Sequence, residues 1–366
     1  MENKILFRDV MDIYEKEVSK NTKNKKKVYQ FEKNKMQNIE YICASLQNPN
    51  YTGGNYNIFL IKYPKYRIVM SLNLRDKVIN HYFTRHVLMP KLTKYLDDRN
   101  VATRKNMGTS AGIRYVRKYL EENKKYSKFY ILKIDISKYF YTIDHKILKD
   151  MLKDDLTPFE YKYVSQIIDS TNNPCINAQI LKLKEREYQI TDRKQEIERL
   201  PIYEYGKGLP IGNMSSQFLS IFYLNALDHK IIHDLHVKHY VRYMDDFLLI
   251  HPDKKHLEYC LKEITNILEN KYLLKLNKNK TKIYSSDQGF DFLGYRFRIY
   301  NKKTVMTLRK ESIQRIKKRV KEVNYKYKHN YMSFERAFSS MNNYLYTYQA
   351  SRSKINRIIE KYWFNG

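Results

Sequence analysis

The sequence has few cysteines, few acidic residues and no long apolar run. Its three cysteines, Cys43, Cys175 and Cys260, are far apart and form no CxxC pair, which argues against a disulfide framework or a zinc ribbon. No apolar run approaches the ~18 residues of a membrane span, and the opening MENKILFRDVMD lacks the apolar core of a signal peptide. We therefore expect a cytoplasmic protein with reduced thiols and no membrane contact.

The shortage of acidic residues gives the chain a strong positive charge. The 69 Lys and Arg residues outnumber 39 Asp and Glu residues, for a formal charge of +30. Nucleic acid is the usual partner of so basic a chain. A membrane-surface protein is disfavoured because the basic residues are spread through the whole sequence. The 35 tyrosines could stack on bases, although a biased genome could produce the same composition.

Hydrophobic periodicity predicts both helices and strands. A Lys-rich segment at 21–27 is either a phosphate-binding loop or a solvated one, and the highly charged segment 176–206 is interpreted as an insertion outside the core. The expected elements are a helix within 2–20, a hairpin over 56–70 turning at Pro64, a helix over 74–92 ending near Pro90, a strand over 129–135, helices from about 145 and 216, and helices near 313–327, 334–348 and 355–363.

The stretch HYVRYMDDFLLI, residues 239–250, places two adjacent carboxylates between strand-like apolar runs. Met244, Asp245 and Asp246 fall where a tight hairpin turn would fit. Asp135 ends another apolar run, FYILKID, and its carboxylate could meet that of Asp245. Such an oxygen cluster suits two Mg²⁺ ions about 4 Å apart, which could support in-line phosphoryl transfer.

Two cations on the early hairpin could hold a nucleotide triphosphate. The ammonium of Lys62 and the guanidinium of Arg67 would serve the same anion. Taken alone, each would be an ordinary surface cation, and an isolated pair of aspartates would be a solvated turn. Only the combination of these cations with the aspartates indicates a nucleotide site.

Several sequence blocks together resemble those of bacterial, group II intron-like reverse transcriptases. They occur in the family order over roughly residues 58–300 and read IKYPKYRIVMSLNLRDKVI, RNVATRKNMGTSAG, LKIDISKYFYTIDH, GLPIGNMSSQ, YVRYMDDFLLI, LKLNKNKTKI and FDFLGYRF. The resemblance implies an α+β right-hand polymerase. Its fingers would lie within 1–128, its palm within 129–300 and its helical thumb within 301–366.

The resemblance also implies roles for individual residues. Asp135 and Asp245 would be the main metal ligands, with Asp246 beside them and the Ile136 carbonyl helping. Phe140 matches the aromatic residue that excludes a 2′-hydroxyl, although a core Phe is an equal alternative without the family context. Lys280 matches a lysine that approaches the incoming phosphates, and FDFLGYRF matches a hairpin that grips the primer.

One block departs from the intron enzymes. Where they resemble PQGxxxSP, this chain has Ile211 in place of Gln and Gln217 in place of the closing Pro. The block is similar to the IGNxxSQ of reverse transcriptases from diversity-generating retroelements, in which the apolar residue lies against the nascent pair and copying is error-prone opposite adenine. That group implies dNTPs, a template RNA, a cDNA product and a small basic accessory protein that forms a pentameric barrel.

Three other functions remain open at this point. The insertion and the tyrosine-rich end leave room for a reverse transcriptase of phage defence. The charge alone would also suit a non-catalytic RNA-binding scaffold. An RNA-dependent RNA polymerase would share the palm. The defence enzyme would also make cDNA but for another purpose, the scaffold would incorporate no nucleotide, and the RNA polymerase would differ in its choice of sugar.

Overall fold

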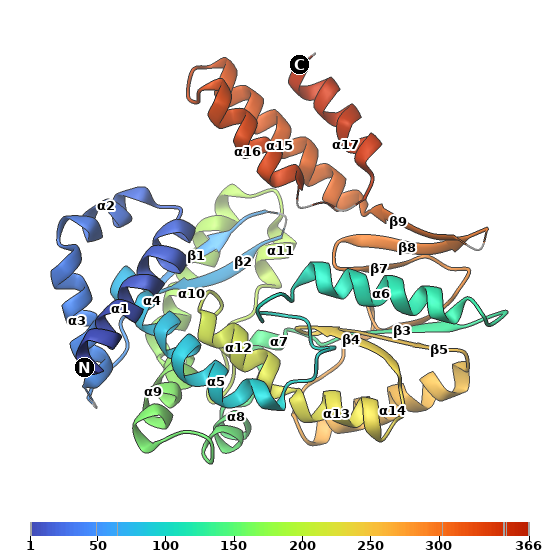
Figure 1. Ribbon diagram of the computed structural model, residues 1–366, viewed down its shortest axis with the longest axis horizontal. Helices are drawn as coiled ribbons and strands as arrows, with labels where there is room; N and C mark the ends of the chain where they lie inside the picture. Colours follow the sequence, from blue (N-terminus) through green and yellow to red (C-terminus); the bar gives the residue numbers. More distant parts are fainter. Residues whose placement is uncertain are drawn as a thin grey trace.

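A computed structural model describes residues 2–48, 50–63, 65–301, 303–346, 348 and 350–364. In Figure 1, N-terminal helices lie at one end, a four-stranded antiparallel sheet with its helices lies at the other, and three C-terminal helices stand above both. Helices and separate antiparallel sheets make up the chain, which confirms the α+β fold class.

The N-terminal helices pack around apolar residues that recur at helical spacing. Val10, Tyr14 and Val18 have no exposed surface, so the predicted helix in 2–20 is confirmed. Pro90 lies in the first turn of its helix, where a missing N–H is tolerated, and the helical path therefore continues past it. These elements are α1 (Glu2–Ile13), η1 (Tyr14–Ser19), α2 (Lys25–Lys33), α3 (Lys35–Gln47), α4 (Leu74–Phe83), η2 (Thr84–Leu88), α5 (Met89–Leu92) and η3 (Thr93–Tyr95).

The predicted early hairpin is present, and the charged insertion covers it. Strands β1 and β2 pair antiparallel; the expected turn residue Pro64 lies outside the described residues. Ile58 and Ile68 share a hydrophobic cluster with Ile176, Ile180 and Ile197 of the insertion. The 176–206 segment therefore forms a second layer on the hairpin. The elements are β1 (Asn57–Ile61), β2 (Arg67–Ser71), α10 (Pro174–Ile190) and α11 (Lys194–Glu198).

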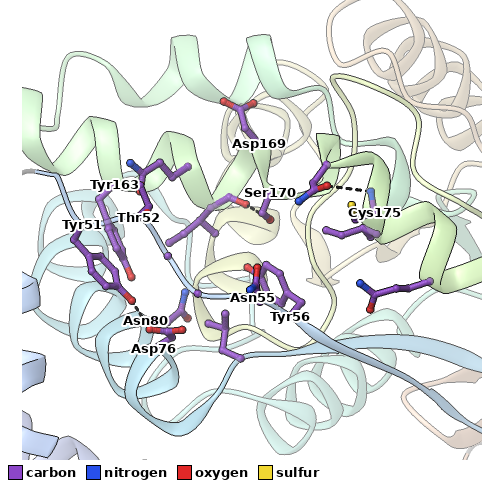
Figure 2. A pocket seen from close by; sticks show the side chains of 18 residues that line it. Tyr51, Thr52, Asn55, Tyr56, Asp76, Asn80, Tyr163, Asp169, Ser170 and Cys175 are labelled. Atoms are coloured by element: carbon purple, nitrogen blue, oxygen red, sulfur yellow. Dashed lines mark hydrogen bonds between the residues drawn. The ribbon is translucent and has the colours of Figure 1, made fainter.

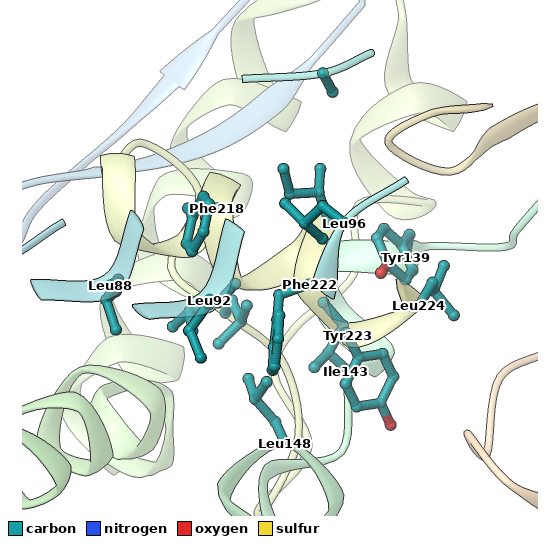
Figure 3. Packing of buried hydrophobic residues seen from close by; sticks show 14 of the residues in the cluster. Leu88, Leu92, Leu96, Tyr139, Ile143, Leu148, Phe218, Phe222, Tyr223 and Leu224 are labelled. Atoms are coloured by element: carbon teal, nitrogen blue, oxygen red, sulfur yellow. The ribbon is translucent and has the colours of Figure 1, made fainter. Parts of the chain in front are cut away.

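A four-stranded antiparallel sheet in the order β4-β5-β3-β6, called the central sheet below, is the largest sheet among the described residues. Figure 3 shows part of the core, where Leu88 and Leu92 lie with Phe218 and Phe222. This core joins the N-terminal helices to the central sheet. The elements are α6 (Thr109–Asn123), β3 (Tyr130–Asp135), α7 (Tyr139–Thr142), α8 (His145–Leu152), α9 (Pro158–Asp169), η4 (Ser170–Asn172), α12 (Met214–Tyr223), α13 (Asn225–His233), β4 (His239–Tyr243), β5 (Asp246–His251), α14 (Lys254–Asn270) and β6 (Lys282–Ser285).

The C-terminal part combines a three-stranded sheet with helices. Apolar residues of α15, including Ile316 and Val320, share one cluster with Phe297 of the sheet. The β8–β9 pairing continues past residue 300, so this sheet extends beyond the expected palm boundary. No helix in the described part of the chain is long and apolar enough to cross a membrane. The elements are β7 (Phe290–Phe292), β8 (Tyr295–Tyr300), β9 (Lys303–Leu308), α15 (Lys310–Lys328), α16 (Phe334–Tyr346), α17 (Arg352–Ile359) and η5 (Glu360–Phe364).

Candidate active site

The YMDD segment forms the tight turn that its sequence predicts. Tyr243 pairs with Asp246 across β4 and β5, which leaves Met244 and Asp245 as a two-residue hairpin loop. Met244 has a φ of 56°, in the left-handed region that such short loops require. The turn exposes part of Asp245, while Asp246 is already the first residue of β5.

The sheet register brings the third aspartate to the same place. Asp135 is the last residue of β3, and its Cα partner across the antiparallel β3–β5 pair is Asp246. Directly opposed residues of neighbouring strands lie about 5 Å apart. The central sheet therefore unites Asp135 with the Asp245–Asp246 turn, although more than a hundred residues of sequence separate them.

Lys280 and Lys133 each pair with one of the three aspartates. Lys280 Nζ donates to both carboxylate oxygens of Asp135, at 3.0 and 2.9 Å. Lys133 Nζ lies 3.5 Å from Asp246 Oδ1. Burying several like charges together is costly without such cations. Lys280, predicted to approach nucleotide phosphates, thus lies on a candidate metal ligand.

The residues fit divalent ions in donor type, but they do not form a finished ion cage. Asp246 Oδ1 is buried and makes no hydrogen bond among the described residues, although the Lys133 ammonium lies 3.5 Å away, so this hard oxygen could accept a metal ion if Lys133 moved. In the same described part of the chain, no group of three or more His, Cys, Asp or Glu side chains is arranged to hold a metal ion. Completing a site therefore requires side-chain adjustment, which the half-exposed ammonium of Lys280 could make by leaving Asp135.

The electrostatics of the turn show how crowded the carboxylates are. Burial, followed by the neighbouring charge of Asp246 and then that of Asp135, raises the pKa of Asp245 from 3.8 to about 6. Burial likewise raises the pKa of Asp246, with Lys133 opposing the effect and Asp135 adding to it. Each shift means that the ionised form is disfavoured in the absence of another cation.

We expect the contribution of Asp245 to the stability of the metal-free protein to decline as the pH rises from about 4 to about 6. The folded chain holds a proton on Asp245 to a higher pH than the unfolded chain does, so stability from this group is complete below 3.8 and lost as the pH rises toward 6. Chemical denaturation in EDTA at several pH values measures this slope. Asp245→Asn removes this contribution, so the stability of the variant relative to the wild type should rise between pH 4 and pH 6, and an unchanged difference would refute the raised pKa of Asp245.

A buried ion pair supports the turn from beneath. Arg242 and Asp228 have no exposed side-chain surface and are joined by two bonds, one of them from Nε to Oδ1 at 2.6 Å. Arg242 also donates to the Met244 carbonyl at 3.0 Å. Asp228 on α13 therefore orients the guanidinium that holds the backbone of the turn. The sequence analysis did not identify this pair.

Phe140, predicted to exclude a 2′-hydroxyl, and Ile211, the apolar residue of the IGNxxSQ-like block, lie on segments joined by backbone hydrogen bonds to their neighbours. The Phe140 carbonyl accepts a hydrogen bond from Leu209 N at 2.7 Å, and the Phe140 side chain is half-buried. Ile211 is also half-buried, and its carbonyl accepts from Met70 N of β2 at 2.8 Å. Ile136, two per cent exposed, continues from Asp135 and forms a bridge to Leu276.

A glycine is required next to Ile211. Gly212 has a φ of 130°, and a Cβ there would lie 2.6 Å from the Met70 carbonyl oxygen. The close approach of this loop to β2 thus depends on glycine. The loop connects the early hairpin directly to the segment before α12.

Gln217 faces a different, basic surface. It lines a cavity of about 460 Å³ together with Lys77, Arg85 and Gly212. A neighbouring cavity of about 300 Å³ shares Lys77 and includes Lys23 and Lys27 of the Lys-rich segment. Arg85 pairs with Glu17 of the same cavity at 2.9 Å, so Lys77, Lys23 and Lys27 are the cations that form a basic surface beside the Ile211–Gln217 loop, which suits nucleic acid phosphates.

The two predicted triphosphate ligands on the hairpin differ in their surroundings. Lys62 Nζ pairs with Glu187 of α10 at 2.7 Å. Glu187 also accepts from Tyr66, whose ring lies 4.2 Å from the Arg193 guanidinium. Arg67 begins β2 with an exposed side chain, and its charge acts on Tyr141, the residue after Phe140. Lys62 is thus held by the insertion, whereas Arg67 is exposed at the start of β2.

Comparisons with known proteins give the family. A family model described as reverse transcriptase (RNA-dependent DNA polymerase) matches residues 62–297, well over half of the chain. No curated protein matched. A solved structure of apo telomerase from Candida tropicalis, truncated from its C-terminal domain, is similar at 16% identity and a TM-score of 0.47. The match covers 71% of this chain and 56% of the telomerase chain, so this chain spans little more than half its length. The chain belongs to the family of reverse transcriptases, which are RNA-dependent DNA polymerases.

Proposed function

We propose that this protein synthesises cDNA on an RNA template, using dNTPs and two divalent ions held by Asp135, Asp245 and Asp246. The observation that carries the proposal is the β3–β5 register, which sets Asp135 opposite Asp246 and beside the Asp245 turn. The basic surface next to the Ile211–Gln217 loop suits the template. The proposed fingers, palm and thumb span 1–128, 129–300 and 301–366.

The residues of the chain divide the work of nucleotide addition. When bound, a pair of divalent ions would activate the primer 3′-hydroxyl and stabilise the leaving pyrophosphate. Asp135, Asp245 and Asp246 supply the oxygen ligands, with the Ile136 carbonyl next in the chain. Lys280 exchanges Asp135 for the incoming phosphates, and Arg67 binds the same anion. Phe140 lies beneath the sugar and excludes a 2′-hydroxyl.

Primer extension on RNA tests the proposal. The purified chain, a primed RNA, Mg²⁺ and either dNTPs or rNTPs should yield extended DNA and little RNA. Extension with rNTPs alone would instead identify an RNA polymerase. Binding of RNA without any extension would identify a non-catalytic scaffold.

The subtype that we propose is the error-prone enzyme of a diversity-generating retroelement. Its support is Ile211, an apolar residue in the loop before α12. The backbone of Ile211 is held against β2, and its side chain is half-buried. An apolar side chain cannot supply the hydrogen bonds of a glutamine amide to the nascent pair. A structured template RNA and a small basic accessory protein forming a pentameric barrel are the implied partners.

Ile211→Gln should lower misincorporation opposite template adenine by about tenfold, the effect of ~1.4 kcal/mol of added discrimination. The amide would restore hydrogen bonds that penalise a mismatched geometry. Sequencing of cDNA made on a defined RNA measures the error spectrum. Ile211→Leu is the matched control, because it keeps an apolar side chain of equal size and should leave the spectrum unchanged.

The second candidate function is a reverse transcriptase of phage defence. The observation that favours it is the insertion, whose helices α10 and α11 form a packed layer on the fingers hairpin. An error spectrum unaffected by Ile211→Gln would support this alternative. A neighbouring pair of near-duplicate DNA repeats that differ at adenines would support the retroelement instead.

A further inference from the structure

A cavity of about 510 Å³ lies apart from the three aspartates. It is enclosed by the 51–56 loop, α4, α9 and the start of α10, and the described residues that line it include none of the aspartates of the candidate active site. Figure 2 shows Tyr51, Tyr56 and Tyr163 around it. Its volume is in the range of small-molecule sites.

The charge of this cavity is opposite to that of the protein. Although the chain carries a formal charge of +30, the described lining residues include no Lys or Arg and do include Asp76 and Asp169. Asp76 is six per cent exposed, and its donors are the neutral Asn73 amide, at 2.6 Å, and the Tyr51 hydroxyl. Asp169 pairs with Lys149 at 2.6 Å, but no Lys or Arg of the described residues pairs with Asp76, so a phosphate beside Asp76 would meet an uncompensated carboxylate, which disfavours nucleotides and nucleic acid backbones.

The uncharged part of the lining suits a heterocyclic base. Tyrosine rings supply flat apolar surface, and amides such as Asn55 and Gln179 can meet both donors and acceptors. Proteins that bind unstacked bases use this combination of aromatic rings and polar edges. The carboxylate acceptors add a preference for ligands with amino or hydroxyl donors.

We propose that this cavity binds a nucleoside, a base with its sugar but without phosphate. Three hydrogen bonds connect the site to the end of the loop that carries Ile211 and to the start of α12. Tyr56 accepts from Asn213 at 2.8 Å, and Asn80 donates to Ser215 Oγ at 2.8 Å while accepting from Ser215 N. A bound nucleoside therefore contacts the residues that hold this loop. The effect on incorporation rests on the proposed function, but the binding does not.

Cys175 provides a direct readout of binding. It lines the cavity and is exposed, whereas Cys43 is half-buried and Cys260 is buried with a pKa raised to about 11. We expect adenosine to slow alkylation of Cys175 by iodoacetamide on the order of tenfold at ten times its Kd, as measured by mass spectrometry of the full chain. Adenosine 5′-monophosphate should give no comparable protection. Cys43 serves as the internal reference.

Two variants complete the test. Asn55→Trp, on the exposed rim, should fill the cavity and abolish protection by adenosine, whereas Asn57→Trp, which lies outside this cavity, should retain it. Asp245→Asn should also retain it, which separates this inference from polymerase activity. Protection absent with adenosine, guanosine, cytidine and uridine up to their solubility limits would overturn the proposal, as would equal protection by the monophosphate.

Discussion

Asp245→Asn should lower the rate of nucleotide incorporation on a primed RNA by about 10³-fold or more, a rise in the barrier of about 4 kcal/mol. Asparagine keeps the shape of the side chain and can stay in the two-residue turn, but it removes a charged oxygen from the candidate ion site. Single-turnover primer extension with saturating dNTP measures the chemical step without product release.

Asp154→Asn is the matched control for this variant. Asp154 is exposed after α8, and the same change there should leave incorporation within about twofold of the wild type, as expected for a surface substitution. Thermal unfolding should show that Asp245→Asn is folded and no less stable, because it relieves a buried like-charge contact. Equal incorporation by wild type and Asp245→Asn would end the proposed catalytic role.

Asp228→Ala should reduce the free energy of unfolding by about 3–5 kcal/mol. Arg242 is fully buried, and Asp228 accepts bonds from both its guanidinium and the Tyr240 hydroxyl. Without that carboxylate a guanidinium stays buried and unpaired, in a medium where the charge cannot be solvated. The turn at Met244 would lose its orientation as well, so activity should decline with stability.

The exposed pair of Lys254 and Glu258 supplies the comparison for that loss. These residues are joined at 2.8 Å on the surface of α14 with about half of each side chain exposed. Glu258→Ala should therefore change the free energy of unfolding by about 0.5 kcal/mol or less. Denaturation with guanidinium chloride compares the two variants, and equal losses would show that burial does not set the strength of the Arg242–Asp228 pair.

Local patterns were sufficient to predict the elements that carry the site. The apolar run before Asp135 is a strand ending at that residue, and the YMDD segment turns where its sequence indicates. The predicted meeting of Asp135 with this turn is present because two apolar strands, each buried within a central sheet, pair in register. Strand and turn patterns depend on residues close together in the sequence, so they can be recognised without knowledge of the tertiary structure.

The partners of charged residues were not predictable in the same way. Lys62 contacts Glu187, and Arg242 contacts Asp228, but nothing in the spacing of either pair indicates the contact. The partner of a long charged side chain depends on how whole elements pack against each other. Examples are α10 on the hairpin and α13 against β4. For Arg242, a cation inside an apolar strand was a usable signal, because a buried guanidinium requires a carboxylate. The roles given to Ile136, Phe140, Ile211, Gln217 and Lys280 stay predictions.

Anomalous scattering from crystals soaked with Mn²⁺ and a non-hydrolysable dNTP tests the central claim most directly. The account predicts Mn²⁺ peaks within ligand distance of Asp135 and Asp245, with Lys280 moved from Asp135 toward the phosphates. A dNTP bound elsewhere, or clear density for all three carboxylates with no Mn²⁺ between them, would contradict it.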